Sequence, residues 1–456
     1  MNKTETYEPE PATSEEDRVL PGGWYTLGAM LVVTLFAFVD RQLITLAAAP
    51  LAVSLHLSDT QLGLVQGLAF TVFTLVALYP LAWAADRFDR RYVLGVCVVL
   101  WSLGTAACGF AQNFTQLFTA AVAIAAGEAG LGPISMSIVP DLFKGKKRVL
   151  ANGVNYFAGY VGIALALALG GAALGALDAM HHQLPSWLSR WESWRLAFFA
   201  LALPAPLLLM LIAFARLRHS TTAVAIAPAA SSTKALFEHL SSHRWAMAWM
   251  VSALVMYLVA FAGFLVWLPV VATRLFGTSP AQNGVSMGIA TGIGMVGGVL
   301  ISTIALRFLF ARIGQRAPVR VAWLIMLFTT PVLFVLPFVG TSLQLYAGFG
   351  LMMLSGTAVG VLVSTILQNM APAILRARFF AVYSIVATAL PGFAPSLVGW
   401  LSDSIGGQKS LLYALTFFAV PTWIAATFML RKSEGPYALL AEETVRSDAA
   451  YANQRT

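Results

Sequence analysis

The chain has 456 residues, of which 59% are hydrophobic and only 11% are charged, and its mean hydropathy is +0.77. Because soluble domains typically carry about 25% charged residues, this composition argues against a soluble globular protein and indicates a membrane protein. The net charge of +8 does not indicate a nucleic-acid partner, because the basic residues gather in the loops between apolar segments.

Twelve apolar segments follow one another along the chain, each of about the 20 residues that a helix needs to cross a bilayer. We place them at about 24–49, 60–85, 91–111, 114–139, 148–177, 194–217, 245–275, 281–309, 318–339, 342–370, 376–403 and 409–431. The sequence therefore predicts an all-α membrane protein with twelve transmembrane helices.

Basic side chains concentrate in the loops that follow the even-numbered segments. The loops on the other side carry only Arg190, Arg195, Arg274 and Lys409. By the positive-inside rule both termini are cytoplasmic, in an integral protein of the cell inner or plasma membrane. The first 20 residues are acidic and lack an apolar core, so we expect no cleaved signal peptide.

One polar stretch divides the segments into six and six, and the two sides of it resemble each other weakly. The motif at 57–63 before the second segment is echoed at 277–284 before the eighth, and both supply a Ser that can cap the next helix. Two such halves resemble the major facilitators, so we expect two pseudo-symmetric six-helix bundles with a cavity at the midplane. The expected domains are a disordered cytoplasmic N-tail (1–23), an N-terminal six-helix bundle (24–217), a cytoplasmic linker (218–243), a C-terminal six-helix bundle (244–431) and a cytoplasmic C-tail (432–456). We expect about the last 20 residues of the C-tail to be disordered.

Asp40 and Arg41 stand side by side in the middle of the first apolar segment, and Glu128 lies deep in the fourth. An ionised side chain at mid-bilayer costs about 2.5–3.5 kcal/mol even on the most lenient insertion scale. Charges in such positions usually line a polar pathway, so these three residues indicate a transporter.

Four motifs surround these charges in the N-terminal half. They are FVDRQ at 38–42, LSDTQLG at 57–63, DRFDRR at 86–91 and GEA at 127–129. In this order they resemble the Spinster family of major facilitators, whereas the C-terminal half matches mainly in pattern. The resemblance implies secondary active transport by alternating access and an amphipathic substrate of the lysophospholipid or sphingolipid class.

Asp40, Arg41 and Glu128 form a trio with two acids and one guanidinium. In a poorly solvated interior, one of the two acids should therefore hold a proton part of the time. A proton that exchanges with an ion pair is what coupling to a proton gradient requires. The alternative is a static polar clamp between the first and fourth helices.

The helix of Glu128 departs from the Spinster pattern. Family members commonly carry an arginine about seven residues before this glutamate, and here that residue is Ala121. The cation for Glu128 must then be Arg41, or Glu128 is protonated more often.

A second charged cluster stands at the predicted cytoplasmic ends of the second and fourth segments. It comprises Asp86, Arg87, Arg90, Arg91 and Asp141. The resemblance to major facilitators implies that such residues bridge to the other half and stabilise the outward-open state. Asp141 would pair with Arg87 or Arg90.

Polar and aromatic side chains on later segments are candidates for substrate contacts, although such residues can equally form interhelical hydrogen bonds. The candidates are Asn152, Asn155, Tyr156, Tyr160, Trp267, Gln368, Asn369 and Tyr383.

An enzyme is not expected, because all six histidines lie in loops or at segment ends and no Gly-rich phosphate loop is present. We expect no cofactor and no metal site, and a monomer in the bilayer whose partners are protons and one small substrate. Two alternatives stay open beside the lipid transporter: a proton-coupled transporter of organic acids or hydrophobic drugs, and a ligand sensor that does not transport.

Overall fold

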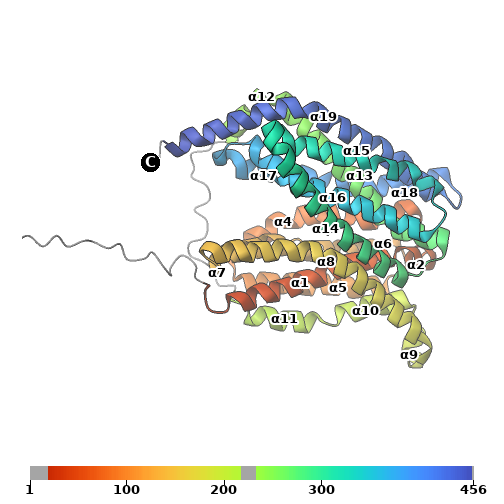
Figure 1. Cartoon of the computed structure of the whole chain (residues 1–456). Coiled ribbons are helices and arrows are strands. Elements are labelled where there is room, and N and C mark those ends of the chain that lie inside the picture. Colours follow the sequence, from red (N-terminus) through yellow and green to blue (C-terminus); the bar gives the residue numbers. More distant parts are fainter. Residues whose placement is uncertain (1–18, 217–232, 454–456) are drawn as a thin grey trace, which may run out of the picture.

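A computed structural model describes residues 19–216 and 233–453, which are helical almost throughout (Figure 1). The N-terminal half comprises α1 (Gly23–Leu46), α2 (Ala48–Ser54), α3 (Asp59–Gly63), the π-helical turn η1 (Leu64–Ala69), α4 (Phe70–Arg87), α5 (Arg90–Phe110), α6 (Phe114–Glu128), α7 (Leu131–Leu142), α8 (Gly145–Met180), η2 (His181–Gln183), α9 (Ser186–Ser189), α10 (Ser193–Ala202) and α11 (Ala205–Phe214).

The C-terminal half begins after the segment that is not described. It comprises α12 (Thr233–Ser242), α13 (Arg244–Phe276), α14 (Pro280–Ile313), η3 (Gly314–Arg316), α15 (Ala317–Val335), η4 (Leu336–Phe338), α16 (Ser342–Met370), α17 (Ala373–Ala389), η5 (Pro391–Phe393), α18 (Ala394–Ile405) and α19 (Ser410–Asn453).

Ten helical segments in the described part of the chain are long and apolar enough to cross a membrane. One of them, Pro280–Phe338, contains two helices, α14 and α15, and the shorter apolar helix α6 is not among the ten. These helices are consistent with the twelve crossings that the sequence predicts.

The two halves lie one above the other in Figure 1, with most of α1–α11 below and most of α12–α19 above, while α14 reaches down to pack along α8. The start of α1 and the end of α19 lie at the same end of the molecule, which we call the terminal face, and α2 and α9 lie at the opposite face. The positive-inside rule predicts that the terminal face is cytoplasmic.

Side-chain caps begin α3 and α14, which follow two of the predicted outer loops. The hydroxyl of Ser58 accepts from the backbone N–H of Gln61, and that of Ser279 accepts from the N–H of Gln282, both at 3.2 Å. Capping by these two residues is what the weak repeat between the halves predicts.

The C-terminal tail is not disordered over residues 432–453, so that prediction is wrong. There α19 continues as a helix and buries Tyr437, Leu440, Ala441 and Thr444 against the rest of the C-terminal half. These residues recur every three or four positions, which places them on one face of the helix. Within the predicted linker, α12 is also helical; residues 1–18 and 217–232 lie outside the described residues.

Candidate functional site

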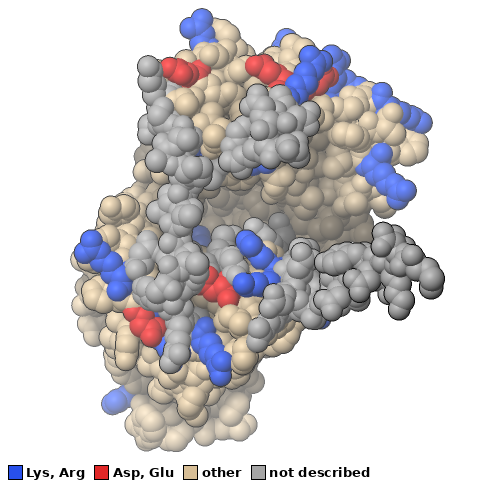
Figure 2. Space-filling view, turned by 90° about the vertical axis from the view of Figure 1, so that its left-hand side faces the viewer, with Lys and Arg blue, Asp and Glu red and all other residues tan. Residues whose placement is uncertain are grey.

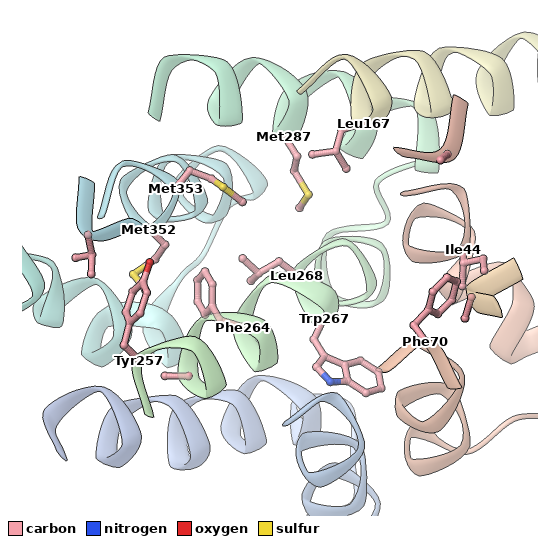
Figure 3. Close-up of a cluster of buried hydrophobic side chains, with 14 of the residues drawn as sticks. Ile44, Phe70, Leu167, Tyr257, Phe264, Trp267, Leu268, Met287, Met352 and Met353 are labelled. Carbon is pink, nitrogen blue, oxygen red and sulfur yellow. The ribbon is translucent and has the colours of Figure 1, made fainter. Parts of the chain in front are cut away.

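A cavity of about 320 Å³ lies between the two halves. Figure 3 shows Ile44, Phe70, Leu167, Met287 and Met353 approaching this space from both halves. Figure 2 shows that the surface is hollowed between the halves on the side of the terminal face.

The lining of this cavity is divided between the halves by polarity. Its polar residues all come from the N-terminal half and are Arg41, Gln42, Thr45 and Gln66. The C-terminal half contributes only apolar residues: Leu258, Phe261, Ala262, Leu265, Val266, Pro269, Met287, Phe349, Met353, Ala387 and Pro391. The N-terminal half also contributes apolar residues, which are Phe38, Ile44, Phe70, Ile163 and Leu167. The cavity therefore has one apolar wall and one mixed wall that carries all of its polar side chains, and we call the mixed wall the polar wall.

Arg41 is the cation of the polar wall. Its side chain is exposed to the cavity, and its guanidinium carbon lies 5.3 Å from the centre of the Phe70 ring. No ion pair in the described part of the chain involves Arg41. A guanidinium can thus offer its donors to an anion in the cavity.

Asp40 is turned away from Arg41 into the packing between α1 and α5. It is 2% exposed, and its Oδ2 accepts a hydrogen bond from the hydroxyl of Thr105. Its Oδ1 is buried and has no hydrogen-bond partner in the described chain. The neighbouring residues Asp40 and Arg41 therefore have separate environments.

Glu128 ends α6, where its Oε1 is buried without a partner among the described residues. Asp40 and Arg41 are near enough to act on it electrostatically, but no ion pair joins Arg41 to Glu128. The sequence left two alternatives for Glu128, and in this conformation the first of them, an ion pair with Arg41, is not formed, because Arg41 faces the cavity instead.

At the terminal face, Arg90 and Asp141 form an ion pair at 2.6 Å. Both residues belong to the N-terminal half, so this pair does not bridge to the other half. Arg87 lies over the ring of Trp83 at 4.5 Å, and an Nη1 atom of Arg91 donates to the carbonyl of Ala213 at 3.3 Å. The side chain of Asp86 lies outside the described residues.

None of the described substrate-contact candidates lines the cavity. Trp267 points away from it in Figure 3 and donates its indole N–H to the carbonyl of Pro395 at 3.1 Å. Asn369 donates to Gln315 and Tyr437, which makes it an interhelical contact. The other candidates lie elsewhere on α8, α16 and α17: Asn152 and Asn155 are half-buried, Gln368 is exposed and Tyr383 is buried. The side chains of Tyr156 and Tyr160 lie outside the described residues.

The two halves are joined at the opposite face by a group of side chains that we call the opposite-face latch: Asp59, Arg274, Ser402 and Asp403. Asp59 accepts two hydrogen bonds from Arg274, at 2.5 and 2.9 Å, and one from Ser402 at 2.7 Å. Asp403 accepts from the backbone N–H groups of Asp59 and Thr60, at 3.0 and 2.8 Å. The motif at 57–63 contains Asp59, and Arg274 is one of the few basic residues of the predicted outer loops, but no pattern along the chain connects the two.

Backbone contacts lie beside the opposite-face latch. Gly63 faces the backbone of Pro395, Gly67 faces the carbonyl of Gly392, and Gly399 faces the backbone of Asp59. A Cβ atom at any of these glycines would clash with that backbone, so only glycine permits this approach. The two halves therefore pack directly against each other beside the opposite-face latch.

Glu192 organises the loop before α10 at the same face. It accepts hydrogen bonds from Ser54, Trp194 and Arg195 at 2.6, 2.9 and 3.1 Å. Partial burial alone would raise the pKa of Glu192. The hydrogen bonds from Ser54, Arg195 and Trp194, together with the positive charge of Arg195, outweigh this effect, so the pKa of Glu192 lies below its usual value.

Comparison with known proteins agrees with this architecture. A sequence model of the Major Facilitator Superfamily matches residues 30–395. The chain belongs to this superfamily. As in its other members, the fold is that of a transporter and not of an enzyme.

The chain is similar to an MFS-type efflux pump of Mycolicibacterium smegmatis, at 28% identity over 86% of this chain and 88% of the relative. It is also similar to Protein spinster homolog 1 of Xenopus tropicalis, at 26% identity over 91% of this chain and 82% of that protein. The crystal structure of a bacterial homolog of the human lysosomal transporter Spinster, inward-facing and unoccupied, shares the fold, with a TM-score of 0.74, 21% identity and coverage of 94% of this chain and 99% of that one.

Proposed function

We propose that this superfamily member is a secondary active transporter that moves an amphipathic anion, of the lysophospholipid or sphingolipid class, by proton-coupled alternating access. One observation carries the proposal: the cavity between the halves has an apolar wall opposite a polar wall that contains Arg41. Such a site can take an apolar chain on one side and an anionic head group on the other.

Alternating access is supported by the different state of the two faces. The ion pair of Asp59 with Arg274 holds the two halves together at the opposite face, whereas a hollow in the surface separates the halves at the terminal face. If the terminal face is cytoplasmic, this conformation is inward-open. The substrate would leave the cavity toward the cytoplasm or enter it from there.

Proton coupling is assigned to Asp40 and Glu128, with Arg41 as the neighbouring cation. Each acid has a buried oxygen without a partner in the described chain. A lone carboxylate charge is costly in such surroundings, and a bound proton or a cation removes that cost. Rearrangement of Arg41 when substrate binds would therefore change which acid holds a proton.

Uptake of lauroyl lysophosphatidic acid into proteoliposomes tests the proposal. Arg41→Gln should lower uptake at least tenfold, because a hydrogen bond to a charged group contributes about 1.5–3 kcal/mol. Asp40→Asn should abolish accumulation driven by a pH gradient and leave counterflow exchange measurable. Arg190→Gln, on an exposed loop of the opposite face, serves as the control. Uptake by Arg41→Gln at the native rate would contradict the anion site, and gradient-driven accumulation by Asp40→Asn would contradict the proton route.

A smaller organic acid or hydrophobic drug is the second candidate. The volume of about 320 Å³ is at the lower end of ligand pockets, and one similar protein is named as an efflux pump. Another, matched over 28% of this chain, is named as a probable L-galactonate transporter of Escherichia coli. Flux of such compounds without flux of lysolipid would favour this candidate, and binding without any flux would indicate a ligand sensor.

A further inference from the structure

Gln66 is a buried polar side chain of the cavity that the coupling scheme does not use. It is 7% exposed and lies in η1. Neither its Nε2 nor its Oε1 has a hydrogen-bond partner in the described chain, although the side chain lines the cavity. Buried amides without partners are rare because they destabilise the fold, so this one calls for a ligand that satisfies it.

The backbone around Gln66 is fixed by contacts with the other half. Gly67, the next residue, lies against the carbonyl of Gly392, and Gly63 lies against the backbone of Pro395. The segment between them is π-helical, a conformation that is rare and frequent at functional sites. Gln66 is therefore held where the two halves meet.

The surroundings of Gln66 define what it can recognise. It shares the polar wall with Arg41, Gln42 and Thr45, and the facing wall from the C-terminal half is apolar. Arg41 can only donate hydrogen bonds, whereas an amide both donates and accepts. An anionic oxygen would satisfy Arg41, and a neighbouring O–H or N–H of the same head group would satisfy the amide oxygen of Gln66.

We propose that Gln66 is a substrate-recognition residue that selects amphiphiles whose anionic head carries a hydroxyl or N–H group beside the anion. This inference rests on the proposed function and adds the chemistry of the head group to it.

Two probes that differ by one hydroxyl test this selection. Dodecanoate and 2-hydroxydodecanoate are titrated against the purified full chain, the Gln66→Met variant and the control Gln112→Met, whose side chain is exposed on the loop before α6. The native protein and Gln112→Met should bind the hydroxylated acid about tenfold more tightly than dodecanoate. In Gln66→Met this preference should disappear, while dodecanoate binding stays within about threefold of native.

Thermal unfolding separates recognition from a structural role. Removing an unpartnered buried amide should leave the melting temperature of Gln66→Met unchanged or raise it, whereas an amide that holds the fold together would lower it. A second variant, Gln66→Glu, keeps the size and polarity of the side chain and should repel both anions while still binding dodecyltrimethylammonium.

Each result decides the matter. The role of Gln66 is overturned if the native protein binds the two acids equally or if Gln66→Met keeps the preference. It is also overturned if Gln66→Met has a lowered melting temperature or if Gln66→Glu binds the anions as tightly as the native protein does. If the native protein binds neither acid, the proposed amphiphile function fails as well.

Discussion

Adjacent residues on α1 have opposite environments in this protein. Arg41 is exposed to the cavity, whereas Asp40 is buried against Thr105 of α5. Successive residues on an α-helix lie about 100° apart, which is enough to direct one side chain to a ligand and the other into packing. The proposed coupling therefore places the substrate and the proton on two sides of one helix.

At the residue scale, Glu192 predicts a pH dependence of stability. Its folded-state pKa lies below the usual value of 4.5, so its stabilising effect is present above that value and is lost as the pH falls through the lower folded-state pKa. The native protein should therefore lose more thermal stability between pH 7 and pH 3 than Glu192→Gln does. Thermal unfolding in detergent at the two pH values measures the difference.

The control for Glu192 is Asp178→Asn at the same face, since the side chain of Asp178 is exposed and has no hydrogen bond or ion pair in the described chain. Identical acid sensitivity of the native protein and Glu192→Gln would contradict the prediction. The change is expected to be small, because half of the Glu192 side chain is exposed.

Some of the site could be predicted from single residues and some could not. Charges in apolar segments identified Asp40, Arg41 and Glu128 as unusual, because charge is costly there whatever the fold. Gln66 was missed, since an uncharged amide in an apolar segment often forms an interhelical hydrogen bond. Its flanking Gly67 was the available signal, but what that glycine contacts depends on tertiary packing.

At the scale of elements, the extension of α19 should stabilise the C-terminal half. Glu434 is 7% exposed and accepts from Arg320 at 2.5 Å and from the indole of Trp323 at 3.0 Å. Glu434→Leu leaves both donors of α15 without this acceptor, so we expect a loss of about 1–3 kcal/mol. The melting temperature in detergent should fall, while Glu442→Gln on the exposed side of the same helix should match the native protein. An unchanged melting temperature of Glu434→Leu would show that the extension does not brace the bundle.

The positions of the long helices followed from hydropathy, but their interruptions did not. The second segment is divided into α3, η1 and α4, and the fourth into α6 and α7. The break in the fourth segment coincides with Gly127, Glu128, Gly130 and Pro133, and the break in the second with Gly63 and Gly67. Such residues also occur inside continuous membrane helices, so they do not by themselves locate an interruption. The extension of α19 was predicted as a tail because its mean hydropathy drops after Arg431, although its spacing of buried residues is helical.

At the scale of the whole molecule, the opposite-face latch predicts a shift in conformation. Asp59→Asn weakens the double hydrogen bond to Arg274, so the population should move toward states that are open at the opposite face. Spin labels at Val53 and Lys409, which are exposed on different halves at that face, should report longer distances in the variant. Asp178→Asn is the matched control, and an unchanged distance distribution in Asp59→Asn would show that the latch does not hold this face shut.

The sequence could not predict which face is closed. It indicated a charged cluster at the terminal face, and the structure joins the halves at the other face through residues 59, 274, 402 and 403. An alternating-access protein has at least two packings of one sequence that differ by a few kcal/mol. The amino-acid sequence is the same in all of these packings, so a sequence pattern cannot indicate which of them a structure adopts.

The backbone-to-backbone contacts at Gly63, Gly67 and Gly399 have a consequence for the rate at which the opposite face opens and closes. Where two main chains touch without side chains between them, nothing has to change rotamer when the surfaces part or meet again. Once the side-chain bonds of the opposite-face latch break, these backbone surfaces can separate with little resistance from interlocked side chains. A single added methyl group at Gly399 would act as a wedge against the backbone of Asp59 and would keep the opposite face from closing fully.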